Sequence, residues 1–324
     1  MHLAVSLDIA AAAAGQTGLA FAEIAGFVGK VEAAGVDMVV ISDSLTSDGP
    51  STSPFEATTL LAALATVTDR IGLVAGASTL AHQPYNLARR FASLDIISHG
   101  RIGWNATLAQ NPREAANFSR PEGFSDDDFR RRAEEYIDIA QGLWRGWDAD
   151  ALLFDKAGGR FHDPDKMHVL DHKGEFFSVR GPLNVARSPQ DAPVLVMSGS
   201  SGADRDFASR VADVILIEEQ SAEAANAASA DLRRRAIAAG RKPAAVKVLL
   251  TVEVASEPDV DRFRALLGSC GCDGLDFALP ADVQELQSFT DRVLPEIHRL
   301  GLAGEDQKGA TLRARLGLGE GGAQ

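Results

Sequence analysis

Eight short apolar runs, each followed by a helix-like stretch, are the feature of this sequence that most constrains its fold. Most of the runs end on a polar side chain. The runs are Leu3–Asp8, Met38–Asp43, Ile71–Thr79, Arg101–Thr107, Val194–Ser201, Asp213–Gln220, Val246–Glu253 and Gly274–Pro280. Parallel strands that are buried on both faces have this composition, and eight of them alternating with helices predict an α/β fold, the (β/α)8 TIM barrel.

The spacing of the runs also predicts the domain organisation. A length of 324 residues, with 45% hydrophobic residues, suits one barrel with an insertion. The regular rhythm breaks between the fourth and fifth runs, where the connection is far longer than a strand-to-helix crossover needs. We therefore assign residues 1–301 to the barrel, with an insertion at 148–193, and residues 302–324 to a loop-like C-terminal tail. An insertion on the upper face of a barrel is expected to cover or shape the site.

Charge and composition exclude several classes of function. Asp and Glu number 45 against 32 Lys and Arg, which gives a formal charge of −13 at pH 7. This charge repels nucleic acids and anionic membranes. The sequence shows neither a positively charged leader nor an apolar run long enough to span a bilayer. Cys270 and Cys272 have a spacing that suits neither a disulfide framework nor a zinc knuckle. We expect a cytoplasmic protein that binds neither nucleic acid nor membrane.

Polar residues at the strand ends are the first candidates for a site, because the C-terminal ends of barrel strands line the active site. Asp43 closes the second run, Ser78 and Thr79 close the third, and Asn105 lies within the fourth. Together they can hold a polar heterocycle by hydrogen bonds. The alternatives are local: a helix N-cap for Asp43 and turn formation for the others. His82 is either an acid, base or polar pocket group, or an ordinary loop histidine.

A Gly/Ser turn, Gly199-Ser200-Ser201-Gly202, joins the fifth run to its helix. Backbone N–H groups and hydroxyls at a helix N-terminus form a phosphate site. Ser200 and Ser201 are therefore candidates for binding phosphate, with ordinary helix capping by Ser201 as the alternative. The basic run 130–132 indicates either a solvated helix face or a contact with an anion.

Histidines and aspartates in the insertion raise the question of a metal site. They are His162, Asp163, His168, Asp171 and His172. This segment has no helical periodicity, so the four-residue spacing of His168 and His172 does not place the two rings on one face. We expect a hydrogen-bonded hairpin surface and no metal.

Several stretches resemble one known family in their order and spacing. They are Ile41-Ser42-Asp43-Ser44, residues 54–78, PYNLARRFASLD at 84–95, GRIGWN at 100–105, Gly142-Leu143-Trp144, DPDKMH at 163–168, GPLNVARSP at 181–189, Gly199-Ser200-Ser201 and GATLRARL at 309–316. The sequence resembles the bacterial luciferase-like flavin monooxygenases, and in particular the branch of nitrilotriacetate and dibenzothiophene-sulfone monooxygenases.

The resemblance implies a cofactor and partners. It implies an FMNH2-dependent two-component monooxygenase that takes reduced FMN from a separate NAD(P)H:flavin reductase and oxygenates a small organic substrate with O2. It also implies a homodimer or homotetramer. It places Asp43, Ser78 or Thr79, and Asn105 near the isoalloxazine and ribityl groups. The same resemblance implies that Ser200 and Ser201 bind the phosphate.

Two substitutions depart from the family pattern. Asp126 and Arg130 stand where the family usually carries His and Tyr. An aspartate beside the phosphate repels it, whereas Arg130 can serve as a charge-assisted donor, so the net effect on phosphate binding stays open. Leu108-Ala109 replaces the usual Thr-Ser. These departures leave two alternatives open. One is an oxidoreductase that uses the deazaflavin F420, whose long acidic tail suits Arg130. The other is a flavin-binding paralogue without catalysis.

Overall fold

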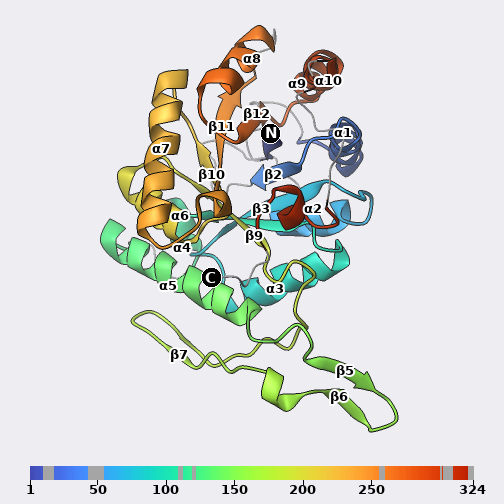
Figure 1. The fold of residues 1–324 in the computed structure, drawn as a ribbon, viewed down its shortest axis with the longest axis vertical. Coiled ribbons are helices and arrows are strands. Elements are labelled where there is room, and N and C mark those ends of the chain that lie inside the picture. Colours follow the sequence, from blue (N-terminus) through green and yellow to red (C-terminus); the bar gives the residue numbers. More distant parts are fainter. Residues whose placement is uncertain are drawn as a thin grey trace.

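A computed structural model describes residues 1–9, 18–42, 55–108, 112–118, 122–254, 260–299, 301 and 309–319. Within these ranges, eight parallel strands close into a barrel in the order β1-β12-β11-β10-β9-β4-β3-β2 (Figure 1). The strands are β1 His2–Asp8, β2 Met38–Ser42, β3 Gly72–Ser78, β4 Ile102–Thr107, β9 Val194–Ser198, β10 Val214–Ile217, β11 Lys247–Glu253 and β12 Gly274–Pro280. Each of the eight predicted runs contains one of these strands, so the predicted (β/α)8 barrel is confirmed.

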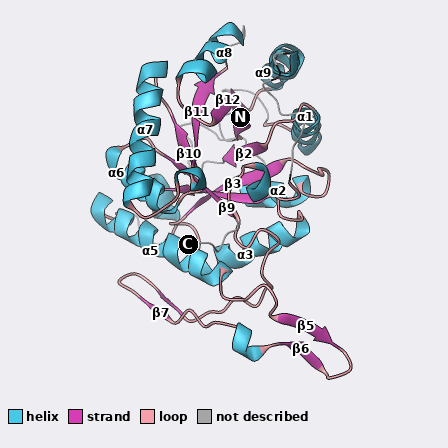
Figure 2. Cartoon of the chain, viewed as in Figure 1, coloured by secondary structure: helices cyan, strands magenta, loops and turns pink. Residues whose placement is uncertain are grey.

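Helices surround the barrel on its outer side (Figure 2). They are α1 Phe21–Ala33, α2 Ala57–Leu64, α3 Pro84–Ile97, α4 Pro112–Asn117, α5 Asp126–Trp144, α6 Gly202–Val211, α7 Ala222–Ala238, α8 Val260–Ser269, α9 Val283–Ser288 and α10 Leu294–Arg299. A further helix, α11 Leu312–Arg315, lies instead at the N-terminal end of the barrel. Helix α5 starts where the Ser125 Oγ accepts a hydrogen bond from the Asp128 N–H. Its three aspartates in the first turn stabilise this end of the helix dipole. In the part of the chain described, no helix has the length and apolar character needed to cross a membrane.

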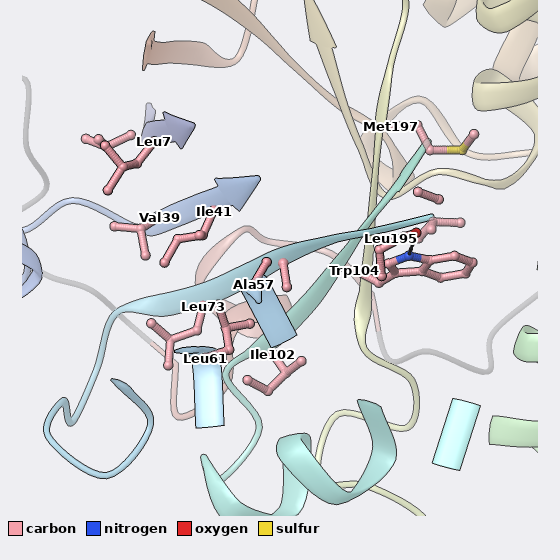
Figure 3. Packing of buried hydrophobic residues seen from close by; sticks show 14 of the residues in the cluster. Leu7, Val39, Ile41, Ala57, Leu61, Leu73, Ile102, Trp104, Leu195 and Met197 are labelled. Carbon is pink, nitrogen blue, oxygen red and sulfur yellow. Dashed lines mark hydrogen bonds between the residues drawn. The ribbon is translucent and has the colours of Figure 1, made fainter. Parts of the chain in front are cut away.

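The strands bury two separate apolar layers, because successive side chains along a strand point to opposite faces. The outer layer packs against the helices, and Figure 3 shows Leu73, Trp104 and Leu195 in it. The Trp104 Nε1 donates to the Ala77 carbonyl at 3.0 Å, so this indole is buried with its polar atom satisfied. The inner layer fills the barrel with Ala4, Met38, Val40, Val74, Val194, Val196, Val214 and Leu249.

The C-terminal segment 309–319 closes the lower, N-terminal end of the barrel. Leu312, Leu316 and Leu318 belong to the inner apolar layer. A Cβ on Gly72 would lie 2.5 Å from the Leu312 Cδ1, so the glycine leaves the space that the leucine fills. Arg313 donates to both carboxylate oxygens of Asp213, at 3.0 and 2.7 Å. The sequence suggested only a loop-like tail here, whereas these residues complete the core of the barrel. The domain limits at 1–301 and 302–324 remain a proposal.

The insertion forms two antiparallel hairpins. Strands β5 Leu152–Asp155 and β6 Arg160–His162 pair with each other and extend away from the barrel (Figure 1). Strands β7 His172–Lys173 and β8 Ser178–Val179 form the second hairpin, which runs beside α5. The Glu135 carboxylate on α5 accepts hydrogen bonds from the backbone N–H groups of Phe176 and Phe177, both at 2.9 Å. The second hairpin is therefore fixed to the barrel's helical shell.

Candidate functional site

Ser78 and Asn105 lie on the row of side chains that faces the barrel axis at its C-terminal mouth. Asn105 pairs with Val196 across β4 and β9 and with Gly76 across β3 and β4. Paired residues of neighbouring strands point to the same side of a sheet, and Val196 belongs to the inner layer. Ser78 follows Gly76 by two residues and shares its side. Both candidates are half-buried, as a ligand-binding position at the mouth requires.

Thr79 occupies a different environment from Ser78. Its side chain is 0% exposed, and its Oγ1 has no hydrogen-bond partner among the residues described. Its carbonyl accepts a hydrogen bond from the Arg132 Nη1 at 2.9 Å. The structure thus brings Ser78 and Asn105 together and encloses Thr79 behind them. Asp43, the fourth candidate for the ring, lies outside the described residues.

A buried carboxylate deeper in the barrel was missed by the sequence reasoning. Asp276 on β12 is 1% exposed and accepts hydrogen bonds from the Ser6 Oγ at 2.8 and 2.9 Å and from the Thr251 Oγ1 at 3.0 Å. Burial raises the pKa of Asp276 to about 6; the two hydroxyls oppose this rise and Glu218 adds to it. An aspartate in the middle of an apolar run is the sequence signal that could have revealed it.

Arg130, Ser200 and Ser201 converge on one anion. The Arg130 Nη1 donates to the Asp204 Oδ1 at 3.0 Å, while the Ser200 Oγ and the Ser201 N–H donate to its Oδ2 at 3.2 and 3.1 Å. Burial alone would raise the pKa of Asp204, but the hydrogen bonds from Ser201 and Arg130 lower it. Ser201 is the N-cap of the ten-residue helix α6, and its Oγ accepts a hydrogen bond from the Asp204 N–H at 3.1 Å, so the capping alternative is confirmed. Serines at a helix N-terminus and a guanidinium are also donors of the kind that bind a phosphate, and here the Asp204 carboxylate occupies them.

The three consecutive arginines of α5 lie in three different environments. Successive residues of a helix are about 100° apart around its axis, so the three side chains diverge. Arg130 reaches Asp204, and Arg131 pairs with Asp128 and Glu175 at the surface. Arg132 is buried against β3. Arg131 therefore fits the interpretation of a solvated helix face, and Arg130 pairs with a carboxylate of the chain itself. Binding of an external anion by Arg130 stays a prediction.

His82 lies just beyond β3, near the first turn of α2. Burial lowers its pKa, the positive charge of Arg90 lowers it further, and Glu56 acts in the opposite direction. A neutral imidazole is suited to accept a proton. Its role as an acid or base remains a hypothesis.

The histidines of the insertion contact separate carboxylates. His168 lies 3.0 Å from Asp148, and His172 lies 2.8 Å from Glu135. In the ranges that the structure describes, no group of three or more His, Cys, Asp or Glu side chains has a metal-binding arrangement. These rings contribute to the hydrogen bonding of the hairpin surface.

Comparison with known proteins identifies the family over most of the chain. The model of a family described as luciferase-like monooxygenase matches residues 1–320. N-acetyl-S-(2-succino)cysteine monooxygenase of Bacillus subtilis (strain 168) is 43% identical over 218 residues, which are 66% of this chain and 49% of that protein. Nitrilotriacetate monooxygenase component A of Aminobacter aminovorans is 44% identical over 196 residues, 60% of this chain and 43% of that protein.

The chain spans about half the length of the curated relatives that it matches. Nitrilotriacetate and dibenzothiophene-sulfone monooxygenases are 44% and 39% identical to it, so the resemblance read from the sequence is confirmed. A solved riboflavin lyase, crystallised with modified FMN and riboflavin, has the same fold. The two structures superpose with a TM-score of 0.87 at 23% sequence identity, and the superposition covers 99% of this chain and 96% of that one.

Proposed function

This chain belongs to the luciferase-like monooxygenase family, and from that premise we propose that it is the oxygenase of a two-component system. In this proposal it uses reduced FMN and O2 to oxygenate a small organic substrate. A separate NAD(P)H:flavin reductase supplies the reduced cofactor. The names of the relatives support the reaction class.

The observation that carries the choice of FMN is the convergence of Arg130, Ser200 and Ser201 on one anion. We propose that these donors, which the Asp204 carboxylate now satisfies, hold the FMN phosphate. A fixed guanidinium and a helix N-terminus recognise a phosphate more strongly than neutral donors do. The phosphate then anchors one end of the cofactor beside the barrel mouth.

Ser78, Asn105 and Asp43 are proposed to orient the ring at the mouth. A hydroxyl and an amide facing the barrel axis can donate to and accept from a polar heterocycle. When bound, the reduced flavin supplies the chemistry with O2, which side chains alone cannot perform. The protein's contribution is to hold the ring, exclude water and place the substrate beside it. His82 is the candidate for moving a proton.

The state of assembly and the location are part of the same proposal. We expect a homodimer or homotetramer, which light scattering would distinguish from a monomer of 34.2 kDa. We place the enzyme in the cytoplasm, where the reductase that it requires has access to NAD(P)H.

Replacing Arg130 with methionine is expected to weaken FMN about tenfold or more, because a charge-assisted hydrogen bond to the phosphate is lost. Riboflavin, which lacks the phosphate, should bind the variant and the wild type equally. Fluorescence titration of the purified protein with both flavins measures this difference. Ser201→Ala should show the same selectivity to a smaller extent.

Arg131→Met is the matched control, since it removes the same charge from the next position of α5, where the side chain is 52% exposed. It should leave both affinities unchanged. Equal losses for FMN and riboflavin in Arg130→Met would contradict the phosphate assignment, because the defect would then not depend on the phosphate.

Reduced FMN bound to the protein is expected to react with O2 in a kinetic phase that free reduced FMN lacks. Stopped-flow absorbance of the protein with reduced FMN, mixed with oxygenated buffer, measures this phase. Binding of reduced FMN without such a phase would favour a paralogue without catalysis. Binding of F420 with no affinity for FMN in either redox state would favour the F420-dependent alternative.

A further inference from the structure

A cavity of about 370 Å³ lies between the end of β3, the first half of α5 and the second hairpin of the insertion. Its walls are Leu80, two polar side chains, Gln83 and Arg132, and the phenyl rings of Phe118, Phe124, Phe176 and Phe177. We propose that this cavity binds the substrate, and that the substrate carries a carboxylate or similar planar oxyanion on a flat apolar body. Its role as the substrate pocket rests on the proposed function. The ligand chemistry rests on the cavity itself.

Arg132 supplies the group that recognises the anion. The residue is only 8% exposed. Arginine is almost never buried unless its charge has partners, and Arg132 has them. Its Nη1 donates to the Thr79 carbonyl, and its guanidinium carbon lies 4.7 Å from the Phe177 ring centre and 5.3 Å from that of Phe124. These contacts fix the plane of the guanidinium. A fixed guanidinium fork matches the two oxygens of a carboxylate.

Phenyl rings supply the surface for the apolar body. Phe118 follows α4, Phe124 precedes α5, and Phe176 and Phe177 lie between β7 and β8. The Phe124 and Phe176 rings meet edge to face, with centres 6.4 Å apart at 77°. Aromatic walls around a single charged group are typical of small-ligand pockets, which span roughly 300 to 1,000 Å³.

The insertion holds its two rings in place through Glu135. Burial alone would raise the pKa of Glu135, but hydrogen bonds from His172 and from the backbone of Phe176 and Phe177 lower it. The second hairpin runs beside α5 (Figure 1). The Glu135 carboxylate on α5 contacts this hairpin through these hydrogen bonds. A hairpin fixed in this way presents rigid rings, so the insertion sets which bodies fit the cavity.

The cavity adjoins the mouth of the barrel. The Leu80 N–H donates to the Ser78 Oγ at 3.1 Å, and Ser78 is the end of β3 on the row that faces the axis. A ligand against Leu80 therefore lies next to the position proposed for the flavin ring. This is the placement that a substrate needs for oxygen transfer.

Equilibrium dialysis of the full chain without flavin, using 2-naphthoate and its neutral isostere 2-naphthamide, tests the proposal. We expect naphthoate to bind about tenfold tighter or more, because only the carboxylate pairs with the guanidinium. Arg132→Gln should abolish this preference. Arg234→Gln, which removes an exposed charge from α7, should keep it.

A second variant separates the pocket from folding, since Arg132 also supports β3. Phe118 is 38% exposed, so Phe118→Ala is expected to fold and to weaken both ligands several-fold. Three outcomes would each overturn the proposal. They are equal binding of the two ligands by the wild type, a preference for naphthoate that survives in Arg132→Gln, and unchanged affinities in Phe118→Ala. The assay contains no flavin, so its result does not depend on whether the protein is an oxygenase. An active oxygenase that binds naphthoate and naphthamide equally would refute the carboxylate pocket alone and leave the proposed function standing.

Discussion

Replacing Gly274 with alanine is expected to leave little or no folded protein. Gly274 opens β12 and pairs with His2 of β1, where the barrel closes between its first and last strands. A Cβ at this position would overlap the His2 carbonyl oxygen. Backbone atoms cannot turn aside as a side chain does, so the two strands would have to separate and the barrel would open. Soluble yield and the circular dichroism spectrum measure the outcome.

Gly26→Ala is the matched control for this substitution. Gly26 lies within α1, and a Cβ there would have no neighbour within 4 Å. Alanine is favoured over glycine inside a helix by up to about 1 kcal/mol, so this variant should be at least as stable as the wild type. A folded Gly274→Ala protein with a wild-type melting temperature would show that the barrel tolerates a wider seam between β1 and β12.

Replacing Asp276 with asparagine is expected to stabilise the protein at neutral and alkaline pH and to change little near pH 4. Burial raises the pKa of Asp276 to about 6 in the folded state, against an ordinary value near 4 in the unfolded chain. Between these two values the folded state binds the proton more tightly, so ionisation of Asp276 lowers stability as the pH rises through about 6. A difference of about two pH units corresponds to a loss on the order of 3 kcal/mol.

The measurement is urea unfolding of wild type and Asp276→Asn at a series of pH values. The stability of the variant relative to the wild type should rise from about pH 4 and level off above about pH 7. Using this difference cancels the contributions of other titrating groups, including the buried Asp95. A difference that does not change with pH would contradict the prediction.

Ser6→Ala provides a second test of the same cause. The Ser6 hydroxyl donates to the Asp276 carboxylate, and this hydrogen bond opposes the effect of burial. Its removal should raise the pKa of Asp276 further and move the loss of stability to higher pH. In the Asp276→Asn background, Ser6→Ala should no longer move the pH dependence of stability, because the titrating carboxylate is absent.

The sequence alone determined the barrel and the general position proposed for the site. Eight apolar runs of strand length between helical stretches leave few alternatives to a parallel barrel, since strands covered on both faces must be apolar throughout. The same reasoning placed the candidates at the strand ends. Ser200 and Ser201 followed from the chemistry of a helix N-terminus, which is local in the chain.

Only the tertiary structure decided which neighbouring residues face the site. Ser78 and Thr79 are adjacent and chemically alike, yet one lies on the row facing the barrel axis and the other is enclosed. Arg130 and Arg132 are two positions apart, yet one reaches Asp204 and the other lines the cavity. The alternation of side chains and the registers between strands set these directions, and registers join residues that are distant in sequence.

The remaining features arise from contacts across long separations in the chain. Segment 309–319 fills the lower end of the barrel because Gly72 leaves room for Leu312, and the cavity forms because the insertion returns to α5. Local pattern determines which elements form, since it reflects the burial of each element's own faces. The site depends on where those elements meet, and this is determined by packing between residues that the sequence does not show to be neighbours.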